Sequence, residues 1–180
     1  MIAAAVTLAG AGASATSLDV GQPVPDFAGR GLDGTTFTLS EAVRAHRAVV
    51  VVFLSTVCPY ARFFEPHLQD LQQKYGDGVL ILGVNSNRTE TAEEARADAV
   101  RRGLTFPIVK DEDLRVADAL GARVTPESFL IDGAGRLRYR GRVRSKIGQD
   151  DLKNALDDVM AGRAVKVPVA KAFGCALRRD

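Results

Sequence analysis

Two runs of consecutive apolar residues stand out in the first half of the chain. Residues 48–54 read AVVVVFL and residues 79–84 read VLILGV. A strand that is apolar on both faces is expected at the centre of a parallel sheet that helices cover on each side. We therefore predict two buried parallel strands in the core of an α/β domain.

A helical pattern separates these two strands. Between residues 59 and 75, apolar side chains recur at spacings of one, three and four, which predicts a helix with an inward-facing stripe. Gly76 and Gly78 are expected to end this helix. The predicted stripe consists of Phe63, Phe64, His67, Leu68 and Leu71.

Shorter patterns complete the predicted order of elements. Asp33-Gly34 is a turn signal before a β-type run, and the DGAG sequence at 132–135 predicts a second hairpin turn. Parallel strand–helix–strand units thus come first, and an antiparallel hairpin and a helix close the domain. Further strands are predicted at 35–39, 106–109, 127–131 and 137–143, and further helices at 40–46, 89–102, 111–120 and 149–160.

Basic side chains alternate along the last predicted strand. From Arg136 to Lys146 every second residue is Arg or Lys, so these side chains share one face. This face could be a nucleic-acid or anion-binding patch, or supply an arginine that assists a reactive thiolate. In the interpretation that we favour, it is an exposed strand that its charges protect from pairing.

Length and composition narrow the class of protein. A chain of 180 residues with 46% hydrophobic and 26% charged residues is typical of one globular domain and excludes a disordered chain. The net charge of +2 does not by itself indicate nucleic acid as a partner. No run of about 18 apolar residues occurs, which argues against stable membrane insertion. Two Cys and two His argue against a disulfide-rich scaffold and against a zinc site.

The first residues differ from the rest of the chain. Residues 1–15 (MIAAAVTLAGAGASA) carry no charge, contain a short apolar run and end in an A-x-A pattern, which predicts a secretory signal peptide. We therefore expect an exported protein, periplasmic or secreted. The positive start of such signals is missing, and the alternative is a disordered tail on a cytoplasmic protein. The other predicted units are a folded domain at 20–162 and a C-terminal tail at 163–180 that carries Cys175.

Cys58 is the main candidate for chemistry. It follows a predicted strand and precedes Pro59, a residue that favours the first turn of a helix. At such a junction the unpaired backbone N–H groups and the helix dipole favour a thiolate, and Arg62, one turn further on, would add positive charge. The alternative is a small buried hydrophobic residue, since free Cys is often buried.

Thr125-Pro126 is a second feature of interest, because it precedes a late predicted strand. A proline at this place is either an ordinary start of a strand or a cis-proline. Proline has no N–H group. If Pro126 lies beside Cys58, the backbone next to it can pair with an extended, thiol-bearing partner.

Taken together, these features resemble the thioredoxin superfamily. The matching order is a strand, Cys-Pro at a helix start, Thr-Pro further on, and a closing hairpin and helix. The opening segment VGQPVPDFAGRGLDGTTFTLSE resembles the redoxin branch, which includes alkyl hydroperoxide reductase and thiol-specific antioxidant (AhpC/TSA) proteins. The segments VCPYARFFEPHLQDL, GVNSN, ARVTPESFLIDGAGRLRYRGRV and AGRAVKVPVAKAFGCALRR resemble its peroxiredoxin-like group. The resemblance implies a thioredoxin-like three-layer α/β/α fold with a central mixed sheet and an N-terminal β-hairpin extension.

The sequence also departs from the patterns of these families. Ala61 stands where a Cys-x-x-Cys motif has its second cysteine, so a local active-site disulfide is excluded. Val51 and Ser55 replace the proline and threonine that precede the peroxidatic cysteine of true peroxiredoxins. Ser55 keeps a hydroxyl that could hydrogen-bond a peroxide oxygen or the thiolate. Val52 replaces the buried acid of thioredoxins.

Cys175 is then the one intrachain candidate for a resolving cysteine. The alternative is a leftover thiol in a frayed tail. Apolar residues in the tail predict that it folds back onto the domain, and Gly174 would let the backbone bend beside the thiol. These apolar residues are Val165, Val167, Val169 and Phe173.

The resemblance implies a thiol-dependent oxidoreductase. The Cys58 thiolate would attack a peroxide or a disulfide, Cys175 would resolve the product, and an external dithiol reductant would complete the cycle. No metal or organic cofactor is implied. One alternative is a redox-inactive peptide-binding module on the same fold. Another is a copper-handling protein, against which the lack of a nearby second cysteine and of a paired histidine argues.

Overall fold

A computed structural model of the chain describes residues 18–145 and 147–180. The signal peptide predicted for residues 1–15 lies outside the described residues. The strands are β1 (Ala28–Gly31), β2 (Thr36–Thr38), β3 (Ala48–Phe53), β4 (Val79–Asn85), β5 (Ile108–Lys110), β6 (Val124–Thr125), β7 (Glu127–Asp132), β8 (Leu137–Gly141), β9 (Val169–Ala170) and β10 (Cys175–Ala176). The helices are α1 (Leu39–Ala45), α2 (Pro59–Tyr75), α3 (Ala92–Arg101), α4 (Arg115–Leu120) and α5 (Asp151–Met160), with a short 3₁₀ turn, η1 (Gly76–Gly78).

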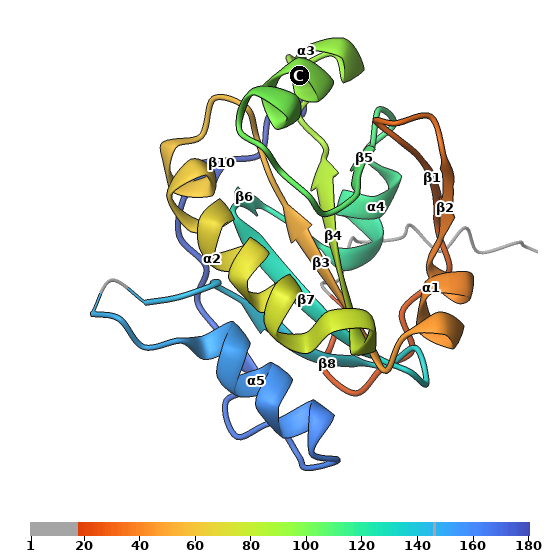
Figure 1. Cartoon of the computed structure of the whole chain (residues 1–180), viewed down its shortest axis with the longest axis vertical. Coiled ribbons are helices and arrows are strands. Elements are labelled where there is room, and N and C mark those ends of the chain that lie inside the picture. Colours follow the sequence, from red (N-terminus) through yellow and green to blue (C-terminus); the bar gives the residue numbers. More distant parts are fainter. Residues whose placement is uncertain (1–17, 146) are drawn as a thin grey trace, which may run out of the picture.

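A mixed sheet forms the centre of the described part of the chain, with eight strands in the order β2-β1-β5-β4-β3-β7-β8-β9 (Figure 1). The two apolar runs form β3 and β4, which pair in parallel with Val50 opposite Ile81. Every residue of β3 is buried, which agrees with a strand covered on both faces. On its other side β3 pairs with β7 in the antiparallel direction, so the sheet is mixed.

Helices cover both faces of this sheet. Apolar side chains of α2 and α5 pack on one face, where Leu68 and Leu156 are fully buried, and both helices lie on the same side of the sheet in Figure 1. Side chains of α1 and α4, such as Leu39 and Leu120, pack on the other face. The predicted three-layer α/β/α fold is therefore confirmed. The N-terminal β-hairpin extension is confirmed as well, because β1 pairs with both β2 and β5.

One predicted helix begins several residues late, and another begins after the second of the two caps that its sequence offers, Thr89 and Thr91. The helix predicted at 111–120 begins at Arg115, because the Asp111 carboxylate accepts hydrogen bonds from the backbone amides of Val116 and Ala117 and ends the preceding loop there. The helix predicted at 89–102 begins after Thr91, whose side chain forms a capping box with Glu94.

The predicted inward stripe of α2 is wrong at one position. Phe64, Leu68 and Leu71 are buried, but Phe63 is 75% exposed. The buried face of the helix runs through Ala61, Phe64, Leu68 and Leu71, a spacing of three and four that leaves Phe63 on the solvent side.

The C-terminal tail packs on the domain through two short strands. β9 pairs in parallel with β8, and β10 pairs antiparallel with β6. The tail therefore folds back, but not through all of the predicted residues, because Val167 and Val169 are 47% and 59% exposed. Ala170 and Leu177 are buried instead. No helix in the described part of the chain is long and apolar enough to cross a membrane.

Candidate active site

Cys58 lies where the loop after β3 enters α2. It is the N-cap residue of α2, with an extended backbone (φ −83°, ψ 114°), and Pro59 occupies the first helical position. Proline at this position sacrifices no hydrogen bond, because the first N–H groups of a helix lack partners within it. The Cys58 side chain is fully buried and points toward the N-terminal end of the helix dipole.

The Thr125–Pro126 peptide bond is cis, which decides between the two alternatives left by the sequence. The loop places Thr125 directly against Cys58, whose Sγ donates a hydrogen bond to the Thr125 carbonyl oxygen at 3.0 Å. Thr125 is 1% exposed, and its hydroxyl has no nitrogen or oxygen partner among the described residues. The Thr125 side chain nevertheless lowers the pKa of the Cys58 thiol.

Cys175 reaches the same place from the C-terminal tail. In the pairing of β10 with β6, Cys175 stands opposite Thr125, and the side chains of Cys175 and Cys58 hydrogen-bond each other. Both cysteines are free thiols in the structure, with Cys58 buried and Cys175 partly exposed. The structure thus brings together Cys58, Thr125, Pro126 and Cys175, which are far apart in the sequence.

The pKa values of the two thiols are shifted in opposite directions. Burial raises the pKa of Cys58, but hydrogen bonds from Cys175, the Thr125 hydroxyl and the Ala61 amide outweigh it, so the pKa lies below its usual value. The hydrogen bond to Cys58, together with burial, raises the pKa of Cys175 to about 11. Of the two thiols, Cys58 is therefore the one that loses its proton first, and Cys175 stays protonated to a higher pH.

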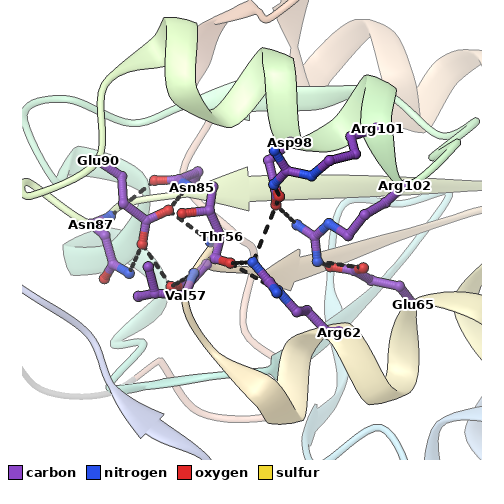
Figure 2. A network of polar contacts seen from close by, with 11 residues as sticks. Thr56, Val57, Arg62, Glu65, Asn85, Asn87, Glu90, Asp98, Arg101 and Arg102 are labelled. Carbon is purple, nitrogen blue, oxygen red and sulfur yellow. Dashed lines mark hydrogen bonds and ion pairs between the residues drawn. The ribbon is translucent and has the colours of Figure 1, made fainter.

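Ser55 does not point at the thiol. Its hydroxyl donates to the Glu90 carboxylate at 2.6 Å, and the same carboxylate accepts a hydrogen bond from the Thr56 amide at 2.7 Å. The side-chain amides of Asn85 and Asn87 donate to it at 2.7 and 2.6 Å. Figure 2 shows this cluster around the loop that leads to Cys58.

Glu90 is 4% exposed, although its place between two threonines does not mark it as a buried residue. Burial raises the pKa of its carboxyl group, but the hydrogen bonds from Ser55, Asn87, Thr56 and Asn85 together hold it below the usual value. The carboxylate is therefore ionised and fully hydrogen-bonded at neutral pH. A Glu shortly after a buried strand that ends in Asn-Ser-Asn is the only signal in the sequence that could have pointed to it.

Arg62 also contacts the loop rather than the thiol. Its guanidinium group donates to the Thr56 carbonyl oxygen, at 3.0 Å from Nε, and forms an ion pair with Asp98 at 3.7 Å. Asp98 also forms an ion pair with Arg102, and Arg102 forms another with Glu65 (Figure 2). Arg62 thus fastens the loop before Cys58 to α2 and α3, in place of the expected contact with the sulfur.

An apolar groove opens beside the cysteine pair. It has a volume of about 690 Å³ and starts at Pro59 and Tyr60, directly after Cys58. Phe173 of the tail forms part of its wall and contacts the Tyr60 and Phe64 rings, with centroid distances of 5.8 and 6.2 Å. Among residues 18–145 and 147–180, no group of three or more His, Cys, Asp or Glu side chains is placed to hold a metal ion.

A cysteine at the start of a helix, beside a cis-proline loop and a second cysteine, on a three-layer α/β/α fold, defines a thiol-based oxidoreductase of the thioredoxin-like class. Residues 20–140 match the AhpC/TSA family, and the chain belongs to this family. The superfamily and branch suggested by the sequence motifs are thereby confirmed.

Relatives with assigned names are similar over much of the chain. It is 35% identical to the thiol-disulfide oxidoreductase ResA of Halalkalibacterium halodurans over 65% of each chain. It is 31% identical to ResA of Geobacillus thermodenitrificans over 80% of each chain. The match thus spans just under two thirds of the first of these relatives.

Solved structures show the same fold. A hypothetical protein from Sinorhizobium meliloti 1021 is 32% identical, with a TM-score of 0.81, and the match covers 91% of this chain and 96% of that one. The peroxidoxin BcpB of Mycobacterium tuberculosis, at 22% identity, has a TM-score of 0.67 over 81% of this chain and 99% of its own. The latter likeness concerns the fold alone.

Proposed function

We propose that Cys58 is the nucleophile of this oxidoreductase and that Cys175 resolves the oxidised intermediate. The observation that carries the proposal is the place of Cys175 against Cys58, opposite Thr125, with opposite pKa shifts that make Cys58 the more acidic of the two thiols. The thiolate, not the thiol, is the attacking species in both peroxide and disulfide chemistry.

With a peroxide as substrate, the Cys58 thiolate attacks one oxygen and the O–O bond breaks. Cys58 becomes a sulfenic acid, and the second oxygen leaves as water or an alcohol after taking up a proton. The Cys175 thiol then attacks the Cys58 sulfur, the sulfenic oxygen leaves as water, and a Cys58–Cys175 disulfide forms. An external dithiol reduces this disulfide and is itself oxidised.

With a disulfide as substrate, the Cys58 thiolate attacks one sulfur and expels the other as a thiolate. Cys175 then attacks the mixed disulfide at Cys58 and releases the second substrate thiol, which leaves the same Cys58–Cys175 disulfide. The names of the ResA relatives favour this substrate class, whereas the motifs shared with the peroxiredoxin-like group favour the first.

The neighbouring residues support the thiolate in different ways. Thr125 supplies a hydroxyl to the sulfur, and Pro126 leaves no N–H group beside it. Pro59 starts the helix whose dipole favours the negative charge. Ser55 and Arg62 act as positioning residues, because both hold the loop before Cys58.

We also propose an exported protein, periplasmic or secreted, on the strength of the signal-like pattern in residues 1–15. The folded domain would then comprise residues 20–162, with residues 163–180 as the tail that delivers Cys175. An exported location suits a thiol pair that cycles through a disulfide.

Peptide mapping of the oxidised protein tests the assignment. After one equivalent of hydrogen peroxide or of an aromatic disulfide, we expect one intrachain Cys58–Cys175 crosslink. Cys58→Ser should abolish reduction of both substrates. Cys175→Ser should keep the first step, accumulate sulfenic acid with peroxide and over-oxidise. Activity that survives Cys58→Ser would show that another residue is the nucleophile, whereas a Cys58 that reacts with neither substrate would indicate a peptide-binding module without redox chemistry.

A further inference from the structure

The end of the tail crosses the site as a strap, defined here as residues 173–179. It begins at Phe173, which packs on the rings of Tyr60 and Phe64. It then runs antiparallel to β6 and places Cys175 opposite Thr125. A strand laid along a sheet edge in this way is the mode by which many proteins bind an extended peptide.

Close packing fixes the strap at its centre. A Cβ atom on Gly174 would lie 2.0 Å from the Thr125 carbonyl oxygen, so no side chain fits there while the strap is docked. Leu177 is 7% exposed in the core, and its amide donates to the Arg123 carbonyl oxygen at 2.9 Å.

Polar contacts fix the strap at its end. The Arg178 amide donates to the Asn87 side-chain oxygen at 2.8 Å, and the Arg178 carbonyl oxygen accepts from the Arg88 amide at 3.0 Å. The Arg179 guanidinium group pairs with Asp118 at 2.5 Å. These contacts come from the loop after β4 and from α4, and they hold the strap over the nucleophile, which is fully buried.

A polypeptide disulfide needs the surface that the strap covers. To bring its sulfur to Cys58, an external chain must pass the Thr125 carbonyl oxygen, which lies 3.0 Å from the Cys58 sulfur. The edge of β6 is the backbone with which such a chain would pair, and Cys175 and Ala176 already occupy it. A small peroxide has no backbone to pair and does not need this edge.

We propose that the strap is an intramolecular competitor for the polypeptide-binding edge of the site. With the strap docked, Cys58 reacts with small oxidants, and a polypeptide disulfide gains access only after the strap lifts from β6. This inference rests on the proposed role of Cys58 and adds the class of substrate to it. The strap also keeps Cys175 in place, so lifting it opens the site to polypeptides and slows formation of the Cys58–Cys175 disulfide.

Two variants weaken the strap without substituting either cysteine, Thr125 or Pro126. Leu177→Ser removes its buried anchor, and Gly174→Ala places a methyl group against the Thr125 carbonyl oxygen. Val167→Ser is the matched control, because Val167 belongs to the same tail but is 47% exposed and precedes the strap. Faster hydrogen exchange at the Leu177 amide reports that the strap is released.

The measurement compares the rates at which reduced protein reacts with hydrogen peroxide and with the disulfides of insulin, a polypeptide probe. If the open state is a minor one of about 1–10%, release should raise the insulin rate roughly 10- to 100-fold. The first-step peroxide rate should not rise with it, because release also removes the Cys175 hydrogen bond that lowers the Cys58 pKa, whereas the peroxide-generated sulfenic acid should persist longer. Val167→Ser should match the unaltered chain in every rate.

Each outcome bears on one claim. If both strap variants fold and their insulin rates stay within a factor of two of the unaltered chain, the strap does not compete for the edge and the inference is overturned. If Cys58 reacts with neither probe in any of the proteins, the proposed function itself fails. If the peroxide rate rises in parallel with the insulin rate, the strap acts as a general lid and the assigned substrate class is wrong.

Discussion

Replacing Glu90 by Gln should weaken two parts of the active site at once: the loop before Cys58 and, through Asn87, the strap. The Glu90 carboxylate accepts hydrogen bonds from Ser55 and Asn87 on one oxygen and from Thr56 and Asn85 on the other. A glutamine retains only one acceptor oxygen. The Thr56 donor is a backbone amide and cannot turn, so the oxygen should stay on that side and the new NH₂ group should face Ser55 and Asn87.

The magnitude follows from these two contacts. The Ser55 hydroxyl can rotate to accept a hydrogen bond, but Asn87 must either leave its NH₂ group unpaired or flip its amide and abandon the Arg178 amide. One lost hydrogen bond to a charged group and one unpaired buried donor amount to about 2–4 kcal/mol. For a chain of this size, that is a fall in Tm of roughly 4–16 °C.

The effect should depend on pH. The pKa of Glu90 is lowered in the folded protein, so its stabilising contribution is present above the unfolded value of about 4.3 and is lost as the pH falls through the folded value. The gap in Tm between the unaltered protein and Glu90→Gln should thus be full at pH 7 and should narrow below about pH 4.

Thermal unfolding followed by circular dichroism across this pH range gives the required curves. Glu93→Gln is the matched control, since it makes the same chemical change at an exposed position at the start of α3. We expect it to shift Tm by no more than about 1 °C at any pH, as is usual for a surface substitution. If Glu90→Gln melts within 2 °C of the unaltered protein at pH 7, the Glu90 hydrogen bonds do not stabilise the loop before Cys58 and the strap, and the reasoning is refuted.

Two further predictions concern the thiols and the tail. Alkylation by iodoacetamide, mapped by peptide, should modify Cys58 with a midpoint below the free-thiol value of about 8.5 and Cys175 only near its pKa of about 11. Cys175→Ala should move the Cys58 midpoint upward because it removes a hydrogen-bond donor. Equal midpoints for the two thiols would contradict this. Gly141→Ala should detach β9, since its Cβ would lie 1.8 Å from the Ala170 carbonyl oxygen, and should lower the free energy of unfolding by more than Gly103→Ala, where the φ is also positive but no atom lies within 4 Å. Chemical denaturation of the two variants gives the comparison, and equal losses, of about 1 kcal/mol each from backbone strain alone, would show that β9 does not need Gly141.

Local sequence patterns were enough to predict the centre of the molecule. In a domain of this size, the unbroken apolar runs of β3 and β4 indicate buried central strands. Cys58 followed by Pro59 indicates a helix start, because the preference of proline for the first helical position depends only on neighbouring residues. The sequence left the cis peptide at Pro126 and its position beside Cys58 open, because no local pattern separates a cis-proline from an ordinary start of a strand.

What the sequence could not predict depends on contacts between distant segments. Glu90 stands between two threonines and looks like part of an exposed helix start, and its burial exists only because the loops after β3 and β4 close over it. Phe63 and Phe64 are neighbours, so periodicity alone could not decide which of them faces the core. Arg62 was expected beside the sulfur because one helical turn separates them, but Thr56 and Asp98 offer its guanidinium group oxygen partners.

The arginine-bearing strand β8 was expected at the edge of the sheet, but β9 covers it. Three of its arginines are paired within the molecule, Arg138 with Asp132, Arg140 with Glu127, and Arg142, just beyond the strand, with Asp151. The interpretation of the basic face as an exposed edge guarded by free charge is therefore wrong. An anion-binding patch gains no support either, since the charges of these arginines are already balanced.

The two borders of the sheet in the described part of the chain are β2 and β9, with three and two residues. Strands this short present few unpaired N–H and C=O groups to another molecule, which limits association of copies edge to edge. Loss of the tail by proteolytic cleavage would uncover Arg140 and Gly141 and leave β8, a strand of five residues, as the border. The tail that carries Cys175 thus also limits aggregation. A preparation that has lost the tail by proteolysis should be checked for turbidity before it is assayed.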